Sequence, residues 1–155
     1  MYFFPDQPFI MRVRGRLYGL LMQGHGSNFQ VSSNVILRTL ENIRVGDHVY
    51  LAPGVIINAG DKVFVDDEVM IGFNSIIAAS NHTIFRGSYR FGCSTSKPIE
   101  LLYGSWVGAN CTILSGSVLP KSSVLGAGSV LNSKNVEEGL YVGTPARYVK
   151  SLVNY

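Results

Sequence analysis

The sequence predicts an all-β parallel solenoid, and three observations support this prediction: a six-residue repeat, a content of 17 glycines in 155 residues, and one long interruption of the repeat. From position 101 onward, the first residue of six consecutive hexads is aliphatic: Leu101, Val107, Ile113, Leu119, Leu125 and Leu131. The fifth residue is small or nearly so: Ser105, Cys111, Ser117, Ser123, Ser129 and Asn135. A period of six differs from the 3.6 residues of a helix and suits a short strand followed by a turn.

Three such hexads, about eighteen residues, would close one triangular coil. We expect the aliphatic first position to point into the coil and the small fifth position to lie where inward space is tight. Stacking of the coils would then satisfy the backbone hydrogen bonds. An upstream set keeps the same frame and, after a two-residue slip, continues toward the interruption; its first positions are Val45, Leu51, Ile57, Val65, Ile71 and Ile77. The predicted β-helix covers residues 31–136.

The two ends do not follow the repeat, and we treat the chain as one domain over residues 1–155. Residues 1–30 carry aromatic residues and three arginines, and we expect a capping strand or arm there. Residues 137–155 form a predicted tail. Within it, Pro145 is placed to begin a short C-terminal helix that would cap the open end of the solenoid.

Composition narrows the class of protein. Hydrophobic residues make up 46% and charged residues 15% of the chain, which excludes a disordered polyelectrolyte. The formal net charge of +3 is too small to argue for nucleic acid, although a small anionic ligand fits it. The low share of charge indicates that much of the surface is used in contacts, so we expect an oligomer.

The sequence favours a cytoplasmic location. The two cysteines, Cys93 and Cys111, do not make a disulfide framework, and the first residues lack the basic region of an export signal. The longest uncharged stretches, 17–37 and 101–120, contain glycine and polar residues, so we expect no transmembrane segment.

The interruption is a polar and aromatic loop at 83–100, and His82 opens it. Long loops inside compact repeats are often functional, although a tolerated surface insertion would look the same. Imidazole is the side chain whose ordinary pKa, about 6.5, lies near neutrality, so it can take a proton from a hydroxyl or amine. His82 is therefore the candidate general base, and a structural histidine is the alternative.

Four motifs carry a resemblance to a known family. They are the Ser-Asn-His step that ends at His82, the Trp-hydrophobic-Gly segment from Trp106, the Gly-Ala-Gly-Ser turn of 126–129, and the Gly-Thr-Pro-Ala-Arg segment of 143–147. Together with the hexads, they resemble the hexapeptide-repeat acetyltransferases, including sugar O-acetyltransferases and xenobiotic acetyltransferases. The resemblance implies a left-handed parallel β-helix, a homotrimer, and a site between two subunits.

The same resemblance implies the roles of individual residues. His82 would be the catalytic base. Cofactor binding would fall to Trp106 along the pantetheine arm, Gly108 of the same segment, the amides of Ala109 and Ala127, and the basic Arg147 and Lys150 at the phosphates of coenzyme A. No metal is expected.

The implied reaction moves an acetyl group from acetyl-CoA to a sugar hydroxyl of a saccharide or a polysaccharide precursor. Transfer would be direct, so neither cysteine is needed as a nucleophile, and Cys111 is expected to be packed inside. Asn58, Asp61, Asp66 and Asp67 are candidates to orient the imidazole, and the sequence does not choose among them.

Other functions stay open. An N-acetyltransferase acting on an amino-sugar nucleotide would differ only in its nucleophile, and a non-catalytic solenoid binding module would bind no coenzyme A. A zinc hydratase of the γ-carbonic anhydrase type would need several closely spaced histidine ligands, and the three histidines, His25, His48 and His82, contain no close pair.

Overall fold

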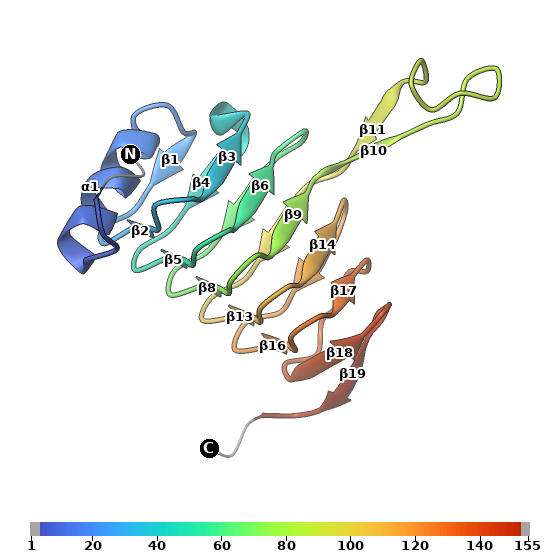
Figure 1. Ribbon diagram of the computed structural model, residues 1–155. Helices are drawn as coiled ribbons and strands as arrows, with labels where there is room; N and C mark the ends of the chain where they lie inside the picture. Colours follow the sequence, from blue (N-terminus) through green and yellow to red (C-terminus); the bar gives the residue numbers. More distant parts are fainter. Residues whose placement is uncertain (1–3, 153–155) are drawn as a thin grey trace.

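A computed structural model describes residues 4–152 and shows one helix followed by a parallel β-solenoid (Figure 1). Each coil gives one short strand to each of three sheets. Sheet A contains β1 (Gly24–His25), β4 (Ile43–Val45), β7 (Val63–Val65), β12 (Ile99–Leu101) and β15 (Val118–Leu119). Sheet B contains β2 (Gln30–Val31), β5 (Tyr50–Leu51), β8 (Met70–Ile71), β13 (Trp106–Val107), β16 (Val124–Leu125), β18 (Leu140–Gly143) and β19 (Ala146–Lys150). Sheet C contains β3 (Ile36–Arg38), β6 (Ile56–Asn58), β9 (Ile76–Ala78), β14 (Thr112–Leu114) and β17 (Val130–Leu131).

The predicted parallel solenoid is confirmed, and its first strand, β1, lies before the predicted start at residue 31. Neighbouring coils before the interruption are offset by 20 residues, as Tyr50 opposite Met70 shows. After the interruption the offset is 18 residues, as in Trp106 opposite Val124. The two-residue slip between Ile57 and Val65 is therefore the pair of extra residues that makes each coil before the interruption 20 residues long. The left-handed sense of the coil stays a prediction.

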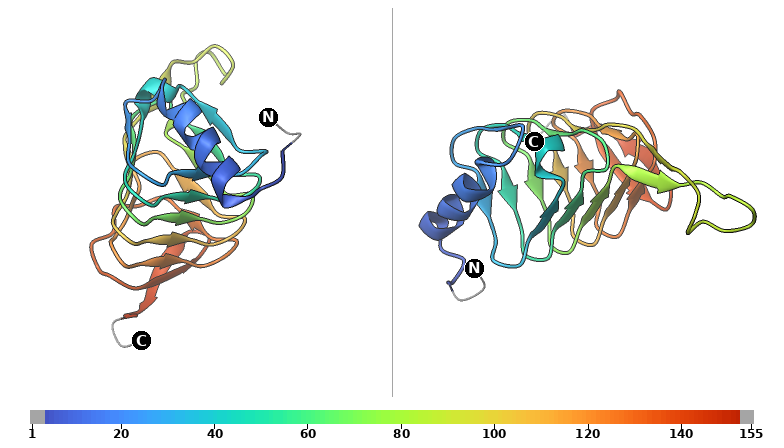
Figure 2. Two further views of the ribbon diagram at one scale, coloured as in Figure 1. Left: turned by 90° about the vertical axis from the view of Figure 1, so that its left-hand side faces the viewer. Right: turned by 90° about the horizontal axis from the view of Figure 1, so that it is seen from above.

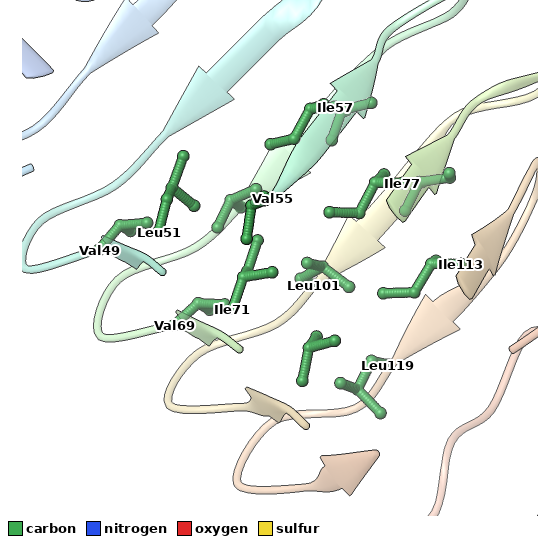
Figure 3. Close-up of a cluster of buried hydrophobic side chains, with 14 of the residues drawn as sticks. Val49, Leu51, Val55, Ile57, Val69, Ile71, Ile77, Leu101, Ile113 and Leu119 are labelled. Carbon is green, nitrogen blue, oxygen red and sulfur yellow. The ribbon is translucent and has the colours of Figure 1, made fainter. Parts of the chain in front are cut away.

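The core is a column of aliphatic side chains inside the coils (Figure 3). All twelve of the aliphatic first positions named above are buried, as the hexad frame predicted. The fifth positions are also buried, including Cys111, except that Asn135 is only half-buried. Burying each large aliphatic side chain contributes about 2 kcal/mol, so the repeat supplies the main driving force for folding.

The interruption is an antiparallel arm that leaves the body of the solenoid (Figures 1 and 2). Its stem pairs β10 (Ser80–His82) with β11 (Ser94–Ser96), and Thr83 donates its backbone N–H to the Cys93 carbonyl at 3.0 Å. The coil resumes at Ile99, which is buried in β12, so the predicted loop boundary at residue 100 was two residues too late.

The strand expected in the N-terminal cap was wrong, because α1 (Pro8–Gly19) is a helix; it lies across the end of the first coil (Figure 2). Proline begins it, and its buried positions, Met11, Arg14, Gly15 and Gly19, follow helical spacing. A Cβ on Gly15 would overlap the backbone of Phe29, so the two glycines allow close packing against the coil. A short 3-10 helix (Leu40–Asn42) follows in the chain.

The predicted C-terminal helix was also wrong. Pro145 lies in the turn between β18 and β19, and residues 146–150 form a strand that runs antiparallel to β18. Tyr148 packs edge-on against the ring of Tyr141, which is buried, at 5.7 Å between ring centroids. This hairpin closes the last coil by pairing with the edge of sheet B. Within residues 4–152, no helix is long and apolar enough to cross a membrane.

Candidate functional site

His82 ends β10, at the edge of the solenoid where sheet C gives way to sheet A. It is exposed and lies opposite Ser94 in the stem of the arm. Among the described residues, none forms a hydrogen bond with its imidazole. The ring is therefore free to meet a substrate.

The residues that could orient this imidazole fall into two groups. Asp66 and Asp67 lie where sheet A gives way to sheet B, on a different edge from His82. Asn58 and Asp61 lie on the same edge as His82, one coil earlier. Asn58 is in register with Ala78, and Gly60 packs so closely on Ser80 that a Cβ on the glycine would lie 2.6 Å from it. The carboxylate of Asp61 accepts the backbone N–H of Lys62 at 2.7 Å, so it is held by its own turn.

Trp106 lies on the outer face of sheet B, with 48% of its surface exposed. Trp106 begins a row of residues that face one another across neighbouring strands of sheet B. The row continues through Val124 and Leu140 and ends at Lys150. Three strand spacings separate the first and last members of this row, about 14 Å. The row thus joins the predicted pantetheine contact to one of the predicted phosphate contacts on one face.

Ala109 and Ala127 occupy equivalent turns between sheet B and sheet C in successive coils. The Ala109 carbonyl accepts the backbone N–H of Gly128 at 2.9 Å, which stacks one turn on the other. The backbone N–H groups of Ala109 and Ala127 donate no hydrogen bond to any described residue. Two backbone donors without an acceptor among the described residues therefore lie along one edge of sheet B, and a donor of this kind needs an acceptor from water or a ligand.

Gly108 has a packing role. A Cβ at this position would lie 2.7 Å from both the Ala127 backbone nitrogen and the Leu125 carbonyl oxygen. Only glycine lets these two coils approach this closely. By fixing the distance between these two coils, Gly108 also sets the separation between the backbone N–H groups of Ala109 and Ala127.

An apolar hollow of about 210 Å³ beside Trp106 was not predicted from the sequence; it is lined by Tyr50, Ala52, Met70, Ile71, Gly72, Phe73, Trp106 and Ala109. Met70 and Phe73 are about half exposed, which is unusual for such large apolar side chains on a strand and its turn. Tyr50 and Met70 are in register with Trp106. The sequence did contain a sign of this hollow. Tyr50, Met70 and Trp106 each immediately precede an inward aliphatic residue, so the hexad frame predicts that all three side chains point outward.

Arg147 and Lys150 both lie on β19 and are exposed. Arg147 pairs with Val142, and its guanidinium donates to the Ala146 carbonyl at 3.1 Å. Neither side chain forms an ion pair with a described residue, so both charges are available to an anion.

The six predicted cofactor residues therefore gather on one side of the molecule, on sheet B or its edge with sheet C. His82 does not join them, because it lies on the edge between sheets C and A. A single copy of the described chain thus carries the two predicted parts of the site on separate edges.

The three histidines are also separated from one another. His25 contacts the Gly26 carbonyl, and His48 lies 2.9 Å from the amide nitrogen of Asn28. Among the described residues, no three His, Cys, Asp or Glu side chains are grouped in a way that could hold a metal ion.

No protein-family profile matches the chain. A putative acetyltransferase of Saccharomyces cerevisiae is 29% identical over 111 residues, which are 72% of this chain and 57% of the yeast protein. The galactoside O-acetyltransferase of Lactococcus lactis is 27% identical over 114 residues, 74% of this chain and 55% of that protein. A hexapeptide-repeat-containing acetyltransferase of Vibrio cholerae, solved with acetyl coenzyme A, superposes with a TM-score of 0.85 at 27% identity, covering 96% of this chain and 81% of that one.

The chain is similar to the hexapeptide-repeat acetyltransferases. The resemblance inferred from the four motifs and the hexads is therefore confirmed. The matched segments cover only a little over half the length of the two curated relatives. The hexapeptide-repeat acetyltransferase of Vibrio cholerae, by contrast, is matched over most of both chains.

Proposed function

We propose that the chain is an acetyltransferase that moves an acetyl group from acetyl-CoA to a sugar hydroxyl of a saccharide or polysaccharide precursor in the cytoplasm. The observation that carries this proposal is the pair of free amides at Ala109 and Ala127, beside the half-exposed ring of Trp106. The similarity to an acetyltransferase solved with acetyl coenzyme A supports it.

Coenzyme A would lie along the outer face of sheet B. The row from Trp106 to Lys150, about 14 Å long, suits an extended pantetheine arm that ends at phosphates. The exposed charges of Arg147 and Lys150 would meet those phosphates, since a guanidinium binds phosphate in a bidentate manner. The apolar hollow beside Trp106 would receive the uncharged end of the donor.

His82 would act as general base. It would take the proton from the acceptor hydroxyl as the hydroxyl oxygen attacks the thioester carbonyl, and would return a proton to the departing thiolate. The Ala109 N–H would donate to the carbonyl oxygen as negative charge develops there. Attack by the acceptor itself needs no acyl-enzyme, which agrees with the burial of Cys111.

The separation of His82 from sheet B argues for a site shared between copies. We propose a homotrimer in which the arm and His82 of one copy face sheet B of the next. A cyclic arrangement repeats the same heterologous contact three times, so it would form three complete sites.

Acetyl-CoA consumption against a panel of acceptors tests donor and acceptor together. The panel would hold neutral sugars, amino-sugar nucleotides and polysaccharide fragments, and acetylation of an amine alone would replace the O-acetyl assignment by N-acetylation. His82→Ala should abolish turnover while coenzyme A binding persists. His48→Asn is the matched control, because it changes an exposed histidine outside the site and asparagine tolerates the positive φ found there.

The free amide can be tested by removing its hydrogen. Ala109→Pro should lower kcat by about 100-fold or more if the Ala109 N–H stabilises the oxyanion. Proline fits this turn, because Pro53 occupies the equivalent position two coils earlier. Ala109→Ser keeps the N–H and should keep most of the activity; equal activity in the proline variant would exclude the amide from catalysis.

A further inference from the structure

Helix α1 exposes a row of large apolar side chains on the side that faces away from the solenoid. Phe9 is 69% exposed, Val13 38% and Leu17 45%, and Leu20 and Leu21, just after the helix, are 78% and 68% exposed. Their spacing of three to four residues places them along one stripe of the helix. The opposite side of α1 is the buried one, so the helix is apolar on its outer face without a partner there.

This stripe lies at the N-terminal end of the solenoid, where the helix crosses the end of the first coil (Figure 2). A shallow apolar hollow of about 280 Å³ adjoins it, lined by Leu17, Tyr18, Leu21 and Leu40. The end of the molecule thus presents a continuous apolar surface, which monomeric proteins rarely leave exposed.

The charge around the stripe is mostly positive: of the two acidic residues that adjoin it, Asp6 is paired with Arg14 and Glu41 is exposed beside Leu40. Residues 7–40 contain four arginines and no acidic residue. Arg14 is buried and already paired with Asp6, whereas Arg16 and Arg38 are exposed and Arg12 is partly exposed. The apolar stripe is therefore flanked by free positive charge, which complements an anionic surface.

We propose that α1 docks the N-terminal end of the protein onto an anionic lipid bilayer, lying in the plane of its surface. A short helix with an apolar face and arginines beside it binds such a surface by burying the apolar side chains among the headgroups. A second copy of the chain is a poorer occupant. Stacking the two ends would bring Arg12, Arg16 and Arg38 of both copies together, with Glu41 as the one nearby acidic residue of each copy that forms no ion pair with a described residue.

This inference does not depend on acyl transfer, so binding is measured without any enzymatic assay. The full chain would be sedimented with vesicles of phosphatidylcholine alone and with vesicles containing about a third phosphatidylglycerol. We expect strong binding only to the anionic vesicles, weakened by added salt because the Debye length shortens.

Two double variants test the two parts of the surface. Leu20→Gln with Leu21→Gln should reduce vesicle binding about tenfold or more, because both side chains are largely exposed and only the bilayer would bury them. Arg12→Gln with Arg16→Gln should reduce it about fivefold for each arginine. Val136→Gln, 89% exposed beyond β17, and Arg44→Gln on sheet A are the matched controls and should bind normally.

Circular dichroism and thermal unfolding would establish that each variant is folded. Absence of binding to anionic vesicles, or equal binding by the leucine variant and the parent, would overturn the proposal. So would a doubling of the mass in solution that the leucine substitutions abolish, because the stripe would then be covered by a second copy.

Discussion

Arg14 and Asp6 form an ion pair, 2.6 Å between Nη1 and Oδ1, that fastens the N-terminal helix to the first coil. Asp6 also accepts the backbone N–H of Ser33 at 2.9 Å, and Arg14 donates to the Val31 carbonyl at 3.2 Å. Three segments therefore meet at one buried guanidinium. The pair explains why one arginine of an otherwise exposed basic helix is only 2% exposed.

Replacing that guanidinium should destabilise the end of the solenoid. Arg14→Met keeps much of the volume but leaves the Asp6 carboxylate without its counter-ion, and we expect a loss of about 2 to 4 kcal/mol in the free energy of unfolding. Urea denaturation measures it. Arg16→Met, on the exposed side of the same helix, should change stability by less than about 0.5 kcal/mol. Equal effects of the two substitutions would show that the ion pair contributes nothing.

Close stacking at Gly108 gives a second prediction. Gly108→Ala would place a methyl group 2.7 Å from backbone atoms of the next coil, and we expect a loss of about 1 to 3 kcal/mol in stability. The same change at Gly24, whose nearest neighbour would be 4.0 Å away, should have little effect. Thermal unfolding compares the two, and a fully stable Gly108→Ala variant would contradict the packing assigned here.

The two cysteines should differ in reactivity. Cys93 is exposed on the arm, whereas Cys111 is buried in the core and burial raises the pKa of its thiol. Because the thiolate is the reactive form, a thiol reagent should label Cys93 in the native protein and Cys111 only in denaturant. Mass spectrometry counts the labels. Cys93→Ser should leave the native protein unlabelled, and rapid labelling of Cys111 would mean that the core opens readily.

Alkaline pH should destabilise the fold. Burial raises the folded-state pKa of the Cys111 thiol above its ordinary value of 9.0, and burial likewise raises the pKa of the Tyr141 hydroxyl above 10.0. The unfolded chain therefore loses these protons first, so stability is complete below pH 9.0 and declines as the pH rises beyond it. The slope for one thiol is at most about 1.4 kcal/mol per pH unit. Cys111→Ala should flatten the decline and Cys93→Ala should not; an unchanged slope in Cys111→Ala would contradict this.

Mixing inactive chains tests the shared site. If His82 of one copy works with Ala109 of the next, refolding equal amounts of His82→Ala and Ala109→Pro together should restore roughly a quarter of the activity. In such a random mixture, about one contact in four joins a chain that keeps His82 to a chain that keeps Ala109. Mixing the folded variants without refolding is the control. No recovery after co-refolding would place both groups in the same chain.

The hexad frame was sufficient to predict the solenoid because each inward position is set by local spacing. Leu101 and its counterparts needed no information about distant residues, since every coil buries the same position in the same way. The arm was visible as a loss of that period, but it begins at Ser80, two residues before the predicted base, so His82 lies within the stem. The frame also predicted the burial of Cys111.

The two ends were predicted wrongly because no repeat governs them. The aromatic residues near the N-terminus favour strands in isolation, but Met11, Arg14 and Gly15 follow helical spacing and pack on the first coil, and this tertiary contact decides the outcome. At the other end, Pro145 is compatible with the start of a helix, yet the open edge of β18 offers backbone partners to residues 146–150. The alignment of Trp106 with Lys150 across sheet B could not be predicted either, because its last step is the pairing of β19 with β18 in this hairpin.

The antiparallel hairpin at one end and the helix at the other also limit growth of the assembly. A parallel solenoid with bare ends could add further chains rung by rung, as a fibril does. Here β19 reverses the strand direction and carries Arg147 and Lys150, and α1 lies across the opposite end. Truncating either terminal element should therefore expose strand edges on which further chains could pair, so these two short segments limit polymerisation.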